Sequence, residues 1–97
     1  MRNYELTVIF DANEEQTAKG LELVLADFSA NQVEIVKQED MGVRNLAYLI
    51  QKHDKGHYFY FDLSADPAVI NTFNHSFKLM NPVLKFLFVL NEKTASK

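Results

Sequence analysis

Hydrophobic and polar residues alternate strictly over residues 3–10, close to the start of the chain. The hydrophobic positions of this stretch are Tyr4, Leu6, Val8 and Phe10. Because successive side chains of a strand point to opposite faces of a sheet, the pattern predicts a half-buried β-strand. The next residues, Asp11-Ala12-Asn13, supply turn and N-cap chemistry, and the two glutamates that follow suit the first turn of a helix.

Two later stretches change to the spacing of an amphipathic helix, with hydrophobic residues three and four positions apart. The first stripe consists of Ala18, Leu21, Val24, Leu25 and Phe28, and it predicts about four helical turns that end at Ser29-Ala30-Asn31. The second stripe consists of Val69, Ile70, Phe73, Phe77 and Met80. Asp66 and Pro67 are typical of an N-cap and a first helical residue, and Asn81-Pro82 is expected to stop this helix.

Three further strands complete the predicted elements. One begins at Val33 and runs to about Lys52, with a bulge or bend at Asp40-Met41-Gly42 because glycine interrupts the pattern there. The stretch 53–56, His-Asp-Lys-Gly, predicts a hairpin turn with a positive φ at the glycine, and HYFYFDL (57–63) follows as a strand. The last predicted strand is VLKFLFVL at 83–90.

The predicted order, β-α-β-β-α-β, is typical of the ferredoxin-like α+β sandwich. We expect a four-stranded antiparallel sheet with two helices on one face, and the right-handed crossover rule places the first and third strands in the middle. Residues 1–91 are expected to form this single domain, and 92–97 a short flexible C-terminal tail.

The other face of such a sheet is uncovered. Alternation assigns the helix-covered face Leu6, Val8, Phe10, Phe59, Phe61, Leu63, Phe86, Phe88 and Leu90. It assigns the open face Glu5, Thr7, Ile9, Tyr58, Tyr60, Val83, Lys85, Leu87 and Val89. This mixture of tyrosines and aliphatic residues predicts an apolar patch, and such patches usually mark a partner surface. A homodimer interface, or aromatic rings that merely shield the sheet, are the alternatives.

Charge is unevenly distributed along the chain, whose formal net charge is −3. Residues 11–40 hold eight acids and two lysines, whereas the other 67 residues hold five acids and eight bases. A protein with one acidic and one mildly basic side can still meet phosphate with the basic one. The absence of cysteine excludes disulfides, thiolate zinc sites and thiol nucleophiles. The sequence has neither the pattern of a signal peptide nor an apolar run long enough to span a membrane, so we expect a soluble intracellular protein.

Catalytic and metal-binding patterns are weak. His53 and His57 lie four residues apart with Asp54 between them, but two histidines without a third ligand are more typical of solvated loop residues than of a metal site. The three glycines are isolated, so no phosphate-binding loop is present, and no serine-histidine-acid arrangement is recognisable. We therefore expect neither an enzyme nor a cofactor.

The stretch GVRNLAYLI (42–50) resembles the signature of the bacterial small-subunit ribosomal protein six family: glycine, a spacer, a basic residue, a polar or basic residue, then Leu-Ala-Tyr-x-Ile. The opening MRNYE is similar to that family's usual start, and Lys78-Leu79 and Val83-Leu84-Lys85 stand where the family tends to carry Arg-Leu and Val-Leu-Arg. The resemblance spans about residues 1–91. This chain departs from the family pattern at Asn45, Leu49 and Gln51. It also carries lysines instead of arginines at positions 78 and 85, and lysine keeps the positive charge but lacks the planar group with which arginine binds a phosphate through two hydrogen bonds.

The resemblance implies a structural, non-enzymatic protein of the ribosome in the cytoplasm. It implies binding to the central domain of 16S rRNA as a heterodimer with small-subunit ribosomal protein eighteen. Carried onto this chain, the resemblance implies RNA contacts by Arg2, Arg44, Lys52 and Lys85. It adds Tyr4 as a further RNA contact at the strand end, although the alternating pattern favours packing of Tyr4 in the core. The candidate partner contacts on the open face are Tyr58, Tyr60, Leu87 and Val89. For Arg44 the alternative is an exposed ion pair with Glu39 or Asp40.

Two rival functions share the same element order. KGHYFYF (55–61) partly resembles the pattern of the RNA-recognition motif, a single-stranded RNA binder, although His57 and Tyr58 do not fit it and the first strand lacks the companion aromatic residue. A small-ligand regulatory domain would place its ligand loop after the first strand, where Asp11-Ala12-Asn13 is only a weak hint.

Overall fold

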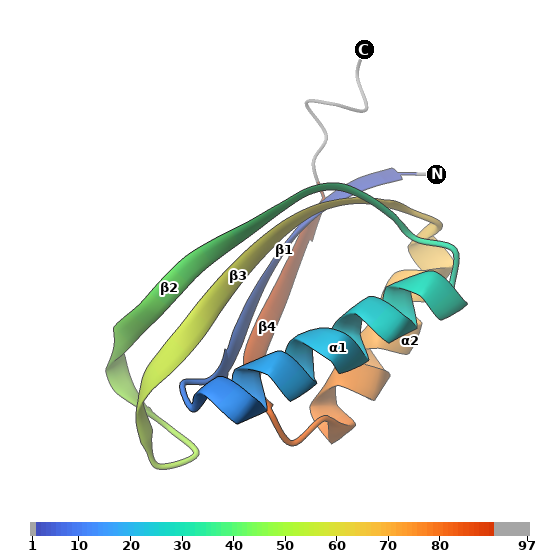
Figure 1. Ribbon diagram of the computed structural model, residues 1–97. Helices are drawn as coiled ribbons and strands as arrows, with labels where there is room; N and C mark the ends of the chain where they lie inside the picture. The colour runs from blue at the N-terminus through green and yellow to red at the C-terminus, as the bar shows by residue number, and fades with distance from the viewer. Residues whose placement is uncertain (1, 91–97) are drawn as a thin grey trace.

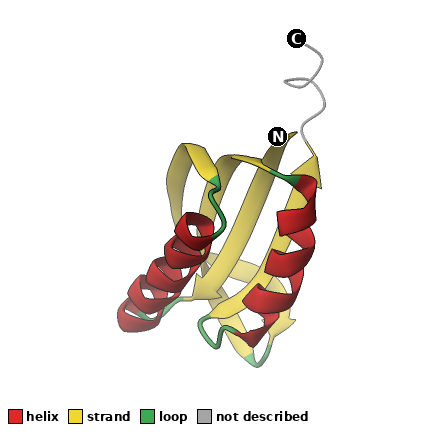
Figure 2. Cartoon of the chain, turned by 90° about the vertical axis from the view of Figure 1, so that its right-hand side faces the viewer, coloured by secondary structure: helices red, strands yellow, loops and turns green. Residues whose placement is uncertain are grey.

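The computed structural model describes residues 2–90 of the 97-residue chain. Its elements are β1 (Arg2–Asp11), α1 (Glu14–Ala30), β2 (Glu34–Ile50), β3 (His53–Ala65), α2 (Pro67–Ser76), the short 3-10 helix η1 (Phe77–Leu79) and β4 (Val83–Leu90). The strands form one antiparallel sheet in the order β2-β3-β1-β4, and both helices lie on the same face of it (Figures 1 and 2). The predicted ferredoxin-like fold is confirmed, including the central position of β1 and β3. The predicted tail, 92–97, lies outside the described residues.

The hydrophobic core fills the space between the helices and the sheet. It consists of alternate residues of the strands and the inner stripes of the helices, among them Leu6, Val8, Phe10, Val24, Phe28, Phe61, Leu63, Phe73 and Phe77. The ring of Phe28 in α1 lies 5.4 Å, edge-on, from the rings of both Phe61 in β3 and Phe73 in α2. Such pairs add about 0.5–1.5 kcal/mol each beyond the burial of their area. Phe28 therefore joins α1 to the sheet and to α2.

Both helices begin where the sequence predicts. The side chain of Asn13 accepts hydrogen bonds from the backbone N–H groups of Glu15 and Gln16 at 3.0 and 3.2 Å. Asp66 caps α2 by accepting from the N–H of Ala68 at 2.9 Å, directly before the proline that starts the helix. The end of α2 differs from the prediction, because the α-helix stops at Ser76 and η1 continues only to Leu79, so that Met80, the last residue of the stripe, follows the helical segment.

The predicted turn at 53–56 is wrong, because the hairpin between β2 and β3 turns at Gln51 and Lys52 instead. Both residues have positive φ, 50° and 69°, as two-residue type I′ turns require, and Ile50 pairs with His53 across the turn. Gly56 is a strand residue without positive φ. Its lack of a side chain serves a close approach, since a Cβ there would lie 2.3 Å from Cγ2 of Ile9.

The strand pairing within residues 2–90 shifts register at four places, and two of these β-bulges bear on the predicted pattern. The first, between Asp40 and Gly42, confirms the predicted bend: Gly42 has φ 83° and its N–H donates to Oδ1 of Asp40 at 2.8 Å. The second lies where β4 begins, since Ile9 of β1 pairs with Lys85 but the next residue of β1 pairs with Val83. Val83 consequently turns to the helix side and is 6% exposed. Its predicted place on the open face is wrong.

Candidate nucleic-acid interface

The β2–β3 hairpin extends past the end of β1 and bends over the open face of the sheet. The last residue of β1 pairs with Gly56, so the part of β3 nearer the turn has no β1 partner (Figure 1). The ammonium group of Lys85 in β4 donates to the hydroxyl oxygen of Tyr48 in β2 at 3.3 Å, although β2 and β4 are the two opposite edges of the sheet. The hairpin therefore brings residues of both edges together on the open face.

Two cations lie over aromatic rings at this place. The guanidinium carbon of Arg44 is 6.0 Å from the ring centroid of Tyr58, and Nζ of Lys85 is 5.8 Å from that of Tyr48. Exposed cation–π contacts contribute about 0.5–1 kcal/mol, enough to favour one placement of a long side chain without burying its charge. We call these four residues the cationic end of the open face. The arrangement presents two exposed positive charges and two aromatic rings on one surface.

Arg44 does not form the ion pair that was its alternative role. Its Nε donates instead to the backbone carbonyl of Met41, at 3.4 Å. Oδ1 of Asp40 lies 2.6 Å from Nε2 of His57, and within residues 2–90 the ion pairs closer than 4.0 Å join His57 to Asp40 and His53 to Asp11. The hydrogen bond from His57, followed by that from the Gly42 N–H, holds the pKa of the Asp40 carboxyl below its usual value.

The other end of the open face is acidic. Glu5 of β1 and Asp62 of β3 lie directly opposite each other, and the hydroxyl of Tyr60 donates to Oδ1 of Asp62 at 2.6 Å. Burial, and then the bond to Asp62, raise the pKa of the Tyr60 hydroxyl, so that it stays protonated as a donor. We call these three residues the acidic end. Leu87 and Val89 of β4, 60% and 47% exposed, lie beside it as apolar surface.

The remaining predicted site residues are spread over the molecule. Lys52 lies exposed at the tip of the hairpin. Arg2 lies at the opposite end of β1, seven residues from Ile9, which corresponds to about 23 Å at 3.3 Å per strand residue. Tyr4 is only 9% exposed and belongs to the core, as its alternation indicates. The structure thus gathers two of the four predicted cations at the cationic end and separates the other two.

Sequence reasoning missed the roles of Tyr48, Asp40 and His57. Strict alternation would place Tyr48 on the same face of the strand as Arg44, but β2 shifts its register on β3 between Asn45 and Ile50, so this signal alone does not fix the position of Tyr48. Its contact with Lys85, 37 residues away in the chain, depends on the bend of the hairpin and has no local signal. Asp40 and His57 meet only through the register of β2 on β3.

Comparison with known proteins gives a consistent result. The family model described as "Ribosomal protein S6" matches residues 3–90. The small ribosomal subunit protein bS6 of Treponema denticola is 41% identical over 92 residues, which cover 92% of this chain and 96% of that protein. The corresponding protein of Phytoplasma mali is 31% identical over 94 residues, which cover 95% and 100% of the two chains.

Solved structures support the fold. The 30S ribosomal protein S6 from Thermotoga maritima superposes with a TM-score of 0.84 at 23% identity, covering 99% of this chain and 98% of the other. The C-terminal domain of the MgtC protein from Mycobacterium tuberculosis superposes less closely, with a TM-score of 0.64 at 14% identity, covering 95% of this chain and 89% of the other. Within residues 2–90, no helix has both the length and the hydrophobicity needed to cross a membrane.

Proposed function

The chain belongs to the ribosomal protein S6 family, structural and non-enzymatic components of the small ribosomal subunit, and we propose that it binds the central domain of 16S rRNA together with small-subunit ribosomal protein eighteen. In this role it acts in the cytoplasm as part of the ribosome. It contributes a fixed surface to a ribonucleoprotein and performs no chemistry.

The observation that carries the RNA part of the proposal is the cationic end of the open face. Phosphate contacts position a protein on RNA, and they need exposed cations whose charge is not already neutralised. Arg44 and Lys85 meet this requirement, because each is exposed and lies over an aromatic ring instead of a carboxylate. Lys52 at the exposed hairpin tip and Arg2 at the far end of β1 lie outside the cationic end, and each would contact a separate part of the RNA. Tyr4 is left out of the proposed contacts because its side chain is buried.

The partner part of the proposal rests on charge and on exposed apolar surface. Salt-dependent affinity for RNA scales with the number of phosphates neutralised, and four candidate cations on a chain of net charge −3 neutralise few. A basic partner supplies the missing charge. The acidic end attracts such a partner, and Leu87 and Val89 beside it provide apolar contact. Tyr58 and Tyr60 complete the proposed partner surface.

The RNA-recognition-motif alternative is not favoured by the geometry of the central strands. Stacking platforms need exposed aromatic rings on both of them. Opposite Tyr58 and Tyr60 of β3, strand β1 carries Ile9 and Thr7, and Ile9 is only 8% exposed.

Binding to a central-domain fragment of 16S rRNA at graded salt, with and without the partner protein, tests the proposal. With the partner, the double variant Arg44→Ala/Lys85→Ala should bind more weakly, and the slope of log K against log salt should become about 1.4–1.8 units shallower, as the loss of two phosphate contacts requires. Lys19→Ala, an exposed lysine of α1, is the matched control. Tight binding by the isolated protein at physiological salt would contradict the need for a partner, and failure to bind in its presence would contradict the RNA-binding role.

A further inference from the structure

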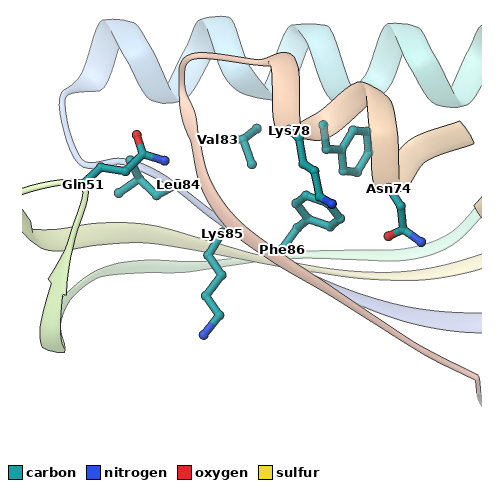
Figure 3. Close-up of a pocket in the computed structure, with 8 residues that line it drawn as sticks. Gln51, Asn74, Lys78, Val83, Leu84, Lys85 and Phe86 are labelled. Atoms are coloured by element: carbon teal, nitrogen blue, oxygen red, sulfur yellow. The ribbon is translucent and has the colours of Figure 1, made fainter. Parts of the chain in front are cut away.

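A pocket of about 430 Å³ opens between the end of α2, the helix η1 and strand β4 (Figure 3). Phe86, which is partly exposed, contributes its aromatic ring, and the buried Phe77 lies behind it with ring centroids 5.3 Å apart. Lys78 and Asn74 extend from the helical side toward Phe86, while Gln51 reaches the other end of the pocket from the hairpin tip (Figure 3). Small-ligand sites occupy about 300–1,000 Å³, so the space suits one small planar group with its substituents.

The charged residues that line the pocket are all positive. Two lysines and no carboxylate line the pocket, and from Pro67 to Leu90 the chain carries two lysines and no acid at all. Lys78 is exposed and forms no ion pair within residues 2–90. The amides of Gln51 and Asn74 each offer donors and an acceptor, the groups that read the edge of a nucleobase. An anionic ligand with a planar, hydrogen-bonding ring complements this lining.

We propose that the pocket binds one unstacked nucleotide of the rRNA, with its base against Phe86 between the two amides and its phosphate on Lys78. The inference rests on the proposed function, because it assigns part of the same RNA to a second place on the protein. Phe86 supplies the stacking contact by which single-stranded nucleotides are held with little sequence preference.

The pocket and the cationic end lie on opposite sides of strand β4. Lys85 also borders the pocket, but its side chain extends from β4 away from Lys78 and Asn74, toward the open face (Figure 3). Strand β4 is an edge of the sheet, and within the described residues its outer side pairs with no other strand. One RNA strand that crosses this edge therefore meets Lys85 on the open face and then Lys78 at the pocket.

Another protein segment could instead pair with the free edge of β4, since edge strands invite such pairing. The charge of the pocket argues for RNA, because a basic partner would bring its cations to Lys78 and Lys85. The two occupants make different predictions for binding of the partner protein in the absence of RNA.

The test uses the full chain with its partner and the 16S rRNA fragment, and compares the variants Lys78→Ala and Asn74→Ala. Lys78→Ala should weaken binding and reduce the salt slope by about 0.7–0.9, as expected for one lost phosphate contact. Asn74→Ala should weaken binding roughly two- to tenfold, the value of one hydrogen bond, with the slope unchanged. Lys19→Ala and Asn71→Ala are matched controls, since both are exposed helical residues outside the pocket, and melting temperatures check that every variant folds.

Two results would overturn the inference while the proposed function stands. In one, the wild type binds RNA with its partner and both pocket variants behave like their controls. In the other, the pocket variants weaken association with the partner when no RNA is present, which would make the pocket a protein contact. If the wild type itself fails to bind RNA with the partner present, the proposed function and this inference fall together.

Discussion

The substitution Gly56→Ala tests how the hairpin is held over the open face. Gly56 is buried in β3, and a Cβ there would lie 2.3 Å from Cγ2 of Ile9, which is itself only 8% exposed. A methyl group at that distance overlaps Ile9, so either the side chain or the hairpin must move. Overpacking costs about 1–3 kcal/mol, and alanine recovers about 0.5–1 kcal/mol of the entropy that glycine loses in a strand. Because a 2.3 Å approach is a severe overlap, the upper part of the overpacking range applies, about 2–3 kcal/mol, and subtracting about 1 kcal/mol for the recovered entropy leaves an expected net loss of about 1–2 kcal/mol in the free energy of unfolding.

Urea unfolding followed by circular dichroism measures this loss, which corresponds to a fall of about 4–16 °C in melting temperature for a domain of this size. The double variant Ile9→Ala/Gly56→Ala supplies the decisive comparison. Because Ile9→Ala removes the atom that the new methyl group would meet, the double variant should be more stable than the sum of the two single losses predicts, by 1 kcal/mol or more. Ser64→Ala, a small change at a partly exposed position of the same strand, should stay within about 0.5 kcal/mol of the wild type. A neutral Gly56→Ala, or strict additivity with Ile9→Ala, would refute the close-approach explanation.

Three further outcomes can be measured by the same unfolding experiments. Replacing Gln51 and Lys52 by Asn-Gly should stabilise the protein by about 1 kcal/mol, since both positions have positive φ; a loss of stability would contradict a type I′ turn. Because the pKa of Asp40 is lowered in the folded state, the stability gained from its bond to His57 is present above the unfolded pKa of about 3.9 and is lost as pH falls through the folded value. Asp40→Asn should therefore lose less stability than the wild type on acidification from pH 5 to pH 2, and parallel curves would refute this. Asn13→Ala should cost about 1 kcal/mol through loss of the α1 cap, and no change would mean that the cap is not formed in solution.

The elements of the fold were predictable because their causes are local. Alternation places Leu6 and Val8 on one face whatever surrounds them, and a cap such as Asp66 acts within its own helical turn. The hairpin turn was not predictable in this way. Gln51 and Lys52 have no preference for positive φ, and they adopt it because the strands on both sides pair up to Ile50 and His53.

The errors on the open face have a non-local origin as well. Strict alternation assigned Val83 to that face, but the bulge at the start of β4 inserts one extra residue and reverses it. The residues around Gly56 are typical of a turn, but glycine is required there because the side chain of Ile9 on the neighbouring strand leaves no space for a Cβ. Both corrections depend on which strand lies beside which, and a single sequence does not contain that information at the residue concerned.

Two residues of the cationic end, Arg44 and Lys85, were among the RNA contacts predicted from the sequence, but Tyr48 and the arrangement of the four residues were not predicted. Arg44 and Lys85 came from the resemblance to a family, and no pattern in the chain indicated that a tyrosine of one sheet edge would hold the lysine of the other. Net charge was equally uninformative, because the fold separates the signs. The acids of α1 lie on the helix side of the sheet, whereas Arg44 and Lys85 lie at one end of the open face and Lys78 just across the edge of β4 (Figures 1 and 3). Since exposed charges more than about 8–10 Å apart are largely screened at physiological salt, a phosphate at the cationic end responds mainly to the charges nearest to it. A negative total charge is therefore compatible with RNA binding, provided that the cations are gathered, and the position of the hairpin over the open face is what gathers them.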